Sequence, residues 1–179
     1  MFNCNFDELR AIASNSKDGL YANAESVGRT PMLMLHWSAG HYGQPFEDYH
    51  INIDQDGTII MSTDDLSETK SHTWKMNTGN IGISMLCCAF ATTNDLGEEP
   101  PTEQQIETMS KIVAILCQEL GLICDYNSVR THAEQADEQL YGPSYTCERW
   151  DLAILHNGEE MMSAGNTLRG KANWYCENM

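Results

Sequence analysis

The chain has 179 residues, with 10 basic and 26 acidic side chains and a formal net charge of −16. This length suits one domain with a sizeable core, and the hydrophobic fraction of 41% is that of a globular protein. The negative charge argues against nucleic acid or anionic lipid as a partner, because both bind clustered Lys and Arg. We expect one domain over residues 1–179, with a core at about 28–156 and a tail at 157–179 that packs on it or forms a short arm.

The termini and cysteines indicate a protein made in the cytoplasm. No apolar run approaches the ~18–20 residues that span a bilayer, so we expect no membrane insertion. The start, MFNCNFDELR, lacks the basic and apolar regions of a signal peptide. Seven cysteines are an odd number in a long chain without an export signal, which favours buried thiols over disulfides. The residues interpreted in this way are Cys87, Cys88, Cys117 and Cys124.

In chain order, the first half predicts one helix and four strands. Apolar residues recur at helical spacing near the start, and later segments are either continuously apolar or alternating. The helix is expected at 6–16 and the strands at 31–37, 49–53, 58–61 and 81–86. An Asp-Gly pair at 56–57 supplies a tight turn, so the second and third strands should form a hairpin.

The second half contains the strongest helical pattern, over residues 103–120. Thr102 and Gln105 form a capping-box pattern at its start, and a glycine follows its end. A short strand at 128–131, a polar loop and a helix beginning at 150–155 are expected next. This order predicts an α/β domain with a central mixed sheet flanked by helices.

Two histidines stand where α/β folds place functional sites, at the carboxyl ends of expected strands. His36 closes the strand at 31–37, and His132 follows the strand at 128–131. Cys147 lies fifteen residues after His132. Two imidazoles and a thiolate suit Zn²⁺ and leave a fourth position for water. The spacing matches no compact zinc-finger pattern, so the residues alone leave metal binding and structural roles both open.

Seven short motifs occur in one order along residues 28–156. They are LHWSAG (35–40), DYHINIDQDGTI (48–59), SHTW (71–74), NTGNIGISM (77–85), PTEQQ (101–105), THAE (131–134) and ERWDL (148–152). Together they resemble the zinc-dependent N-acetylmuramoyl-L-alanine amidases of phage lysozymes and peptidoglycan recognition proteins, with the prophage endolysin branch most similar.

The resemblance implies a monomeric amidase-like fold and a peptidoglycan substrate. The implied reaction hydrolyses the amide between N-acetylmuramic acid and L-alanine of the stem peptide. An endolysin of this kind would reach the wall after release by a holin or by lysis. The alternative is a peptidoglycan-binding module of the same fold that does not cut.

Carried over by position, the resemblance implies zinc ligands His36, His132 and Cys147. Asp137 or Asp151 would be the oxygen ligand if Cys147 is instead an ordinary thiol.

The resemblance also implies roles around the metal. Tyr49 would orient water or stabilise the oxyanion, unless it is an ordinary strand tyrosine. His72 would contact substrate beside the zinc, and Trp37 and Asn80 would line the groove, although a core role for Trp37 is equally compatible with the sequence.

Two positions depart from the family pattern. Ser84 replaces a glutamate that serves many relatives as general base, and Tyr145 stands where others carry a lysine two residues before the third ligand. A phenol could still donate a hydrogen bond there, without the charge. Glu134 is then the carboxylate available as base, and its other interpretation is a solvated or supporting residue.

Overall fold

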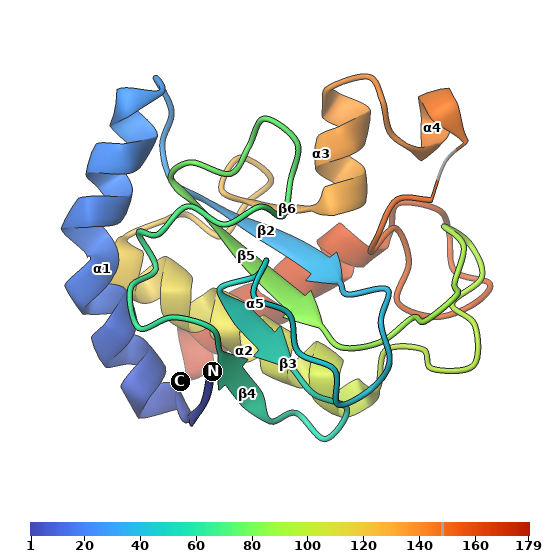
Figure 1. Ribbon diagram of the computed structural model, residues 1–179, viewed down its shortest axis with the longest axis horizontal. Coiled ribbons are helices and arrows are strands. Elements are labelled where there is room, and N and C mark those ends of the chain that lie inside the picture. The colour runs from blue at the N-terminus through green and yellow to red at the C-terminus, as the bar shows by residue number, and fades with distance from the viewer. Residues whose placement is uncertain (148) are drawn as a thin grey trace.

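The computed structural model describes residues 1–147 and 149–179, in which six strands form one sheet and five helices pack around it (Figure 1). The strands are β1 Phe2–Cys4, β2 Met32–Trp37, β3 Ile51–Ile53, β4 Ile59–Met61, β5 Asn80–Met85 and β6 Val129–Thr131. The helices are α1 Phe6–Ser26, α2 Glu103–Leu120, α3 His132–Glu138, α4 Pro143–Thr146 and α5 Ala164–Asn178. None of these helices combines the length and the apolar character needed to cross a membrane.

The sheet has the strand order β1-β4-β3-β5-β2-β6 and is mixed, as the sequence predicts. β1 pairs with β4 and β4 with β3 in antiparallel fashion, whereas β3, β5, β2 and β6 are parallel neighbours. The predicted hairpin is confirmed as β3–β4, and Gly57 in its turn has a φ of +84°, which L side chains rarely adopt. The parallel half of the sheet therefore brings several carboxyl ends to one edge.

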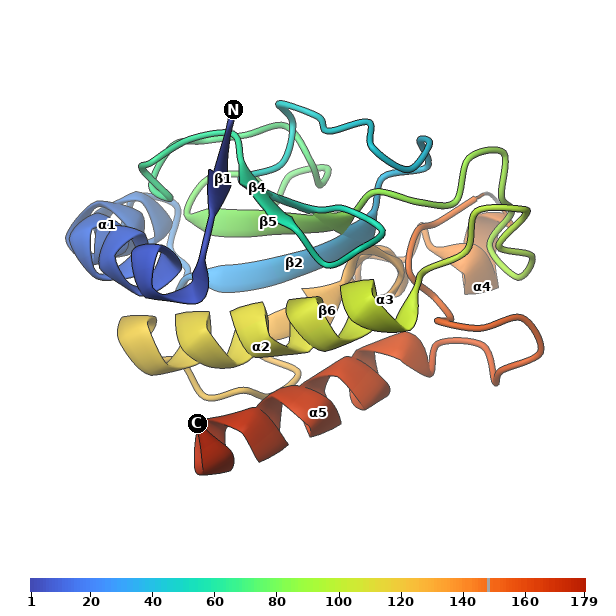
Figure 2. The same ribbon diagram turned by 90° about the horizontal axis from the view of Figure 1, so that it is seen from below.

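The core lies between this sheet and α2. All six residues of both β2 and β5 are buried, as expected for central parallel strands covered on both faces. Figure 2 shows α2 beneath the sheet and α5 beneath α2. α2 has the predicted bounds, with the Thr102–Gln105 capping box at its start and Gly121 in the left-handed conformation at its end. The four cysteines interpreted as buried thiols are buried and free.

Several elements differ from the sequence predictions, and α3 and α4 lie where a polar loop was expected. α1 runs ten residues beyond its expected end, to Ser26, and β1 was not predicted. The helix expected at 150–155 is wrong: those residues form turns, and Leu152 has a φ of +61°. The last helix is instead α5, so most of the tail packs against α2 as a helix.

Candidate metal and active site

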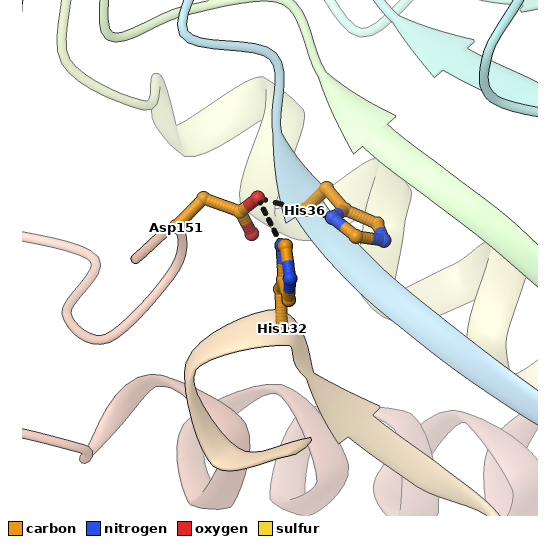
Figure 3. A group of neighbouring side chains, drawn as sticks. All are labelled: His36, His132 and Asp151. Atoms are coloured by element: carbon orange, nitrogen blue, oxygen red, sulfur yellow. Dashed lines mark hydrogen bonds and ion pairs between the residues drawn. The ribbon is translucent and has the colours of Figure 1, made fainter. Parts of the chain in front are cut away.

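Three side chains from separate elements meet at the carboxyl edge of the parallel strands (Figure 3). β2 and β6 are paired with Leu35 opposite Thr131, so the residues that follow, His36 in β2 and His132 at the start of α3, lie side by side. Their ring centroids are 4.9 Å apart. Asp151 arrives from the segment that precedes α5. The sheet register thus brings together two histidines that are distant in sequence.

The two imidazoles converge on one carboxylate oxygen. Nδ1 of His36 lies 3.1 Å from Oδ2 of Asp151, and Nδ1 of His132 lies 2.8 Å from the same atom. The possible ligand atoms of the three residues all lie within 4.8 Å of one another. The other carboxylate oxygen, Oδ1 of Asp151, is buried and has no hydrogen-bond partner among the described residues. Two imidazole nitrogens and a carboxylate oxygen form a donor set that suits a divalent metal such as Zn²⁺.

Electrostatics favour the protonation states that a metal requires. Burial lowers the pKa of His36, although the charge of Asp151 opposes this shift. Burial alone would raise the pKa of Asp151, but the charges and hydrogen bonds of His36 and His132 outweigh it and lower that pKa to about 2. Near neutral pH, His36 is therefore neutral and Asp151 is ionised, as metal coordination demands.

The first turn of α3 fixes the backbone on two sides of the site. Thr131 caps the helix, its hydroxyl accepting the backbone N–H of Glu134 at 3.2 Å. The N–H of Ala133 donates to the backbone carbonyl of Asp151 at 3.1 Å. The same turn therefore carries His132 and holds the chain that carries Asp151.

His72 lies behind His36 rather than in an open groove. Nε2 of His36 points away from Asp151 and is 3.3 Å from both Nδ1 of His72 and Oγ1 of Thr73. His72 is only 8% exposed. The structure thus brings His72 to the site, but as a buried neighbour of His36.

A cavity of about 180 Å³ opens beside the three converging side chains. It is lined by Trp37, Ser38, Ala39, Tyr49, His132, Arg149, Trp150 and Asp151. Two residues expected at the site, Trp37 and Tyr49, are therefore on its wall. An aromatic series continues outward from His132 through Trp150 and Tyr141 to the exposed ring of Trp74.

Tyr49 presents a protonated phenol to this cavity. Its ring centroid is 5.0 Å from that of His36. Burial raises the pKa of the phenol, the charge of Asp151 raises it further, and a hydrogen bond with Ser84 lowers it only in part. Ser84 is fully buried and stands opposite His36 in the β2–β5 register. Tyr49 therefore keeps its proton near neutral pH and can act as a hydrogen-bond donor on the cavity wall.

Arg149 supplies a positive charge that the sequence analysis did not include. Its guanidinium lies over the ring of Trp37, 5.4 Å from the centroid, on the cavity wall. Arg149 stands two residues before Asp151, whereas the predicted ligand Cys147 placed Tyr145 at that offset. The ERWDL motif therefore already contained this cation, which is found by counting two residues back from Asp151 as the ligand.

The structure does not bring Cys147 or Tyr145 to the histidines. Cys147 is exposed at the end of α4, with a φ of +53°, and Tyr145 on α4 is 57% exposed. Asp151, one of the two alternatives left open, takes the place expected for Cys147. The other alternative, Asp137, accepts a hydrogen bond from the hydroxyl of Ser144 at 2.9 Å and is not in the cluster.

Two further expected residues have structural partners elsewhere. Both carboxylate oxygens of Glu134 bind the guanidinium of Arg169, at 2.7 and 2.8 Å, so this buried side chain is not placed as a base. Asn80 begins β5 at the opposite end from His36, and its Oδ1 accepts the N–H of Met32 at 3.0 Å. These contacts tie Glu134 to α5 and Asn80 to β2.

Comparison with known proteins adds a family match. Residues 19–158 match the family described as N-acetylmuramoyl-L-alanine amidase. Among solved structures, the chain is similar to the endolysin N-acetylmuramoyl-L-alanine amidase LysCS from Clostridium intestinale URNW. That alignment has 19% identity and a TM-score of 0.43, and covers 57% of this chain and 68% of the other. No curated protein matches the sequence.

Proposed function

The chain belongs to the N-acetylmuramoyl-L-alanine amidase family, and we propose that it hydrolyses peptidoglycan with Zn²⁺ held by His36, His132 and Asp151. The bond cleaved is the amide between N-acetylmuramic acid and L-alanine of the stem peptide. We further propose that the protein acts as an endolysin, reaching the wall when the cell lyses.

The observation that carries the zinc proposal is the convergence of two Nδ1 atoms on Asp151, whose Oδ1 is buried with no partner in the part of the chain that the structure describes. An ionised carboxylate oxygen is costly to bury unpaired, so an uncompensated one favours a cation at this place. Two nitrogen ligands and one oxygen ligand match the three-ligand sets of catalytic zinc sites. Zinc held here would supply a Lewis acid that polarises the scissile carbonyl and makes water more acidic.

Residues on the cavity wall would stabilise the negative charge that develops on the carbonyl oxygen during hydrolysis. The protonated phenol of Tyr49 on the cavity wall would donate a hydrogen bond to that oxygen. The guanidinium of Arg149 adds a fixed positive charge on the same wall. Donors and charges that are already aimed at a developing oxyanion lower the barrier, typically by ~10²–10³-fold in rate for each donor.

The aromatic wall supports binding of the substrate. Trp150 packs edge-on against His132 at 5.3 Å between ring centroids, and Tyr141 packs against Trp150 at 4.7 Å. Rigid aromatic side chains offer contact area at small entropic cost. We propose that this wall contacts the muropeptide next to the scissile amide.

The test combines metal content with bond specificity. Purified protein is assayed for zinc per chain and for release of new L-alanine amino termini from sacculi, with His132→Ala as the control. One zinc per chain and new termini, both lost in the variant, are the expected result. Zinc without cleavage would replace the enzyme by the binding module, and absence of zinc from the wild type would overturn the metal proposal.

A further inference from the structure

The last helix, α5, begins beyond the residues that match the family and reaches back to the metal end of the sheet. Its Arg169 is 7% exposed and pairs with both oxygens of Glu134, Nη1 to Oε2 at 2.8 Å and Nη2 to Oε1 at 2.7 Å. Nη1 also donates to the backbone carbonyl of Val129 in β6 at 2.9 Å. One buried guanidinium thus joins α5, α3 and β6.

Glu134 connects this guanidinium to the first turn of α3. Its Oε2 accepts the backbone N–H of Thr131 at 2.9 Å, which completes the capping box around His132. Two residues further on, the N–H of Ala133 donates to the backbone carbonyl of Asp151 at 3.1 Å. The turn that Glu134 closes therefore positions two of the three proposed ligands.

The packing around this pair leaves little room for another arrangement. A Cβ on Gly165 of α5 would lie 2.3 Å from both carboxylate oxygens of Glu134, so only glycine permits this approach. The N–H of Ala164 donates to the carbonyl of Ala153 at 3.3 Å, just after Asp151. A buried carboxylate that loses its cation must move or become protonated, and either change weakens the hydrogen bond that Glu134 accepts in the capping box.

We propose that Arg169 is a positioning residue for the metal site: through Glu134, α5 holds His132 and Asp151 in the geometry that binds the metal. This inference rests on the proposed zinc site. Glu134 then connects α5 to the turn that carries the ligands, and it does not accept a proton from water. Arg169 itself touches neither substrate nor metal.

The test measures zinc affinity by competition with a chelator, independently of catalysis. Arg169→Met should weaken zinc binding roughly 10–100-fold, the usual range for residues that orient ligands, and Arg169→Lys should recover part of it. The matched control is Lys171→Met, which removes the ion pair between the same helix and Glu107 of α2. This control should bind zinc within twofold of the wild type. A folded Arg169→Met protein with wild-type affinity, or an equal loss in Lys171→Met, would overturn the proposal.

A second measurement on the wild type covers the case in which Arg169→Met does not fold. Coupling between two equilibria is reciprocal, so zinc must stabilise the docking of α5 if that docking favours zinc. Amide exchange in α5 should slow on zinc addition more than exchange in α1, which packs on α2 and takes no part in the contacts around Glu134. Equal effects on the two helices would contradict the inference. If wild-type protein binds no zinc in the first titration, the proposed function fails, whereas failure only in these comparisons rejects the role of Arg169.

Discussion

The identity of the third metal ligand gives the sharpest prediction. Asp151→Asn keeps the shape of the side chain but removes the charge that both histidines face. Zinc sites with four protein ligands contribute ~10–16 kcal/mol, or about 3 kcal/mol for each ligand. Losing one such contribution weakens binding roughly 10²-fold, since each 1.4 kcal/mol is a factor of about ten. We expect that loss of zinc affinity in Asp151→Asn, together with loss of amidase activity.

The matched variant is Cys147→Ser. Cys147 is exposed at the end of α4 and does not contact the histidines, so this change should leave zinc affinity within about twofold. Both variants are titrated with zinc against a chelator, and both are unfolded in urea with the metal removed, which shows whether they are folded. Zinc binding that survives in Asp151→Asn and disappears in Cys147→Ser would refute the ligand set.

Further predictions concern acid stability, the oxyanion donors and salt. Burial lowers the pKa of His50 from 6.5 to about 4. Its neutral form therefore contributes about 3 kcal/mol above pH 6.5 that is lost as the pH falls to 4; urea unfolding of metal-free His50→Gln should show an acid-induced loss smaller by that amount. Tyr49→Phe should lower kcat roughly 10²-fold with unchanged zinc affinity, measured on a soluble muropeptide; a loss of zinc instead would make Tyr49 structural. Arg149→Met should lower kcat comparably and Arg149→Lys less, and equal rates in the two variants would show that the charge is irrelevant. Because the chain carries a net charge of −16 and cell walls are anionic, digestion of sacculi should rise as salt is added from low ionic strength; the fastest digestion without salt would contradict this.

The parts of the fold that could be predicted are those whose pattern is local. A capping box, an amphipathic face and a terminal glycine predict the helix at 103–120. Continuous apolar runs predict the buried strands. α3 was missed because its apolar positions are alanines, which give little periodic signal over seven residues. The run at 152–155 was assigned to a helix because it is apolar, but its burial comes from turns that tertiary contacts hold in place.

Within the site, the sequence identified the two histidines because each follows a strand. It could not decide between Cys147 and Asp151, since both lie near the Trp-Asp pair and only the path of the chain after α4 determines which one meets the histidines. The pairing of Glu134 could not be predicted for a similar reason. Its partner, Arg169, is 35 residues away, and no local pattern links the two positions.

The identity of the third ligand changes the interpretation of the two departures from the family pattern. Counted back from Cys147, the position two residues earlier holds an exposed phenol and not a cation. With Asp151 as ligand, the same offset holds Arg149 on the cavity wall, so the positive charge of the family's lysine is retained in a different side chain. Ser84 then supports the donor Tyr49 instead of leaving a gap where a base would stand. A guanidinium and a phenol on one cavity wall can both stabilise an oxyanion. This pair of donors favours an active hydrolase over a binding module.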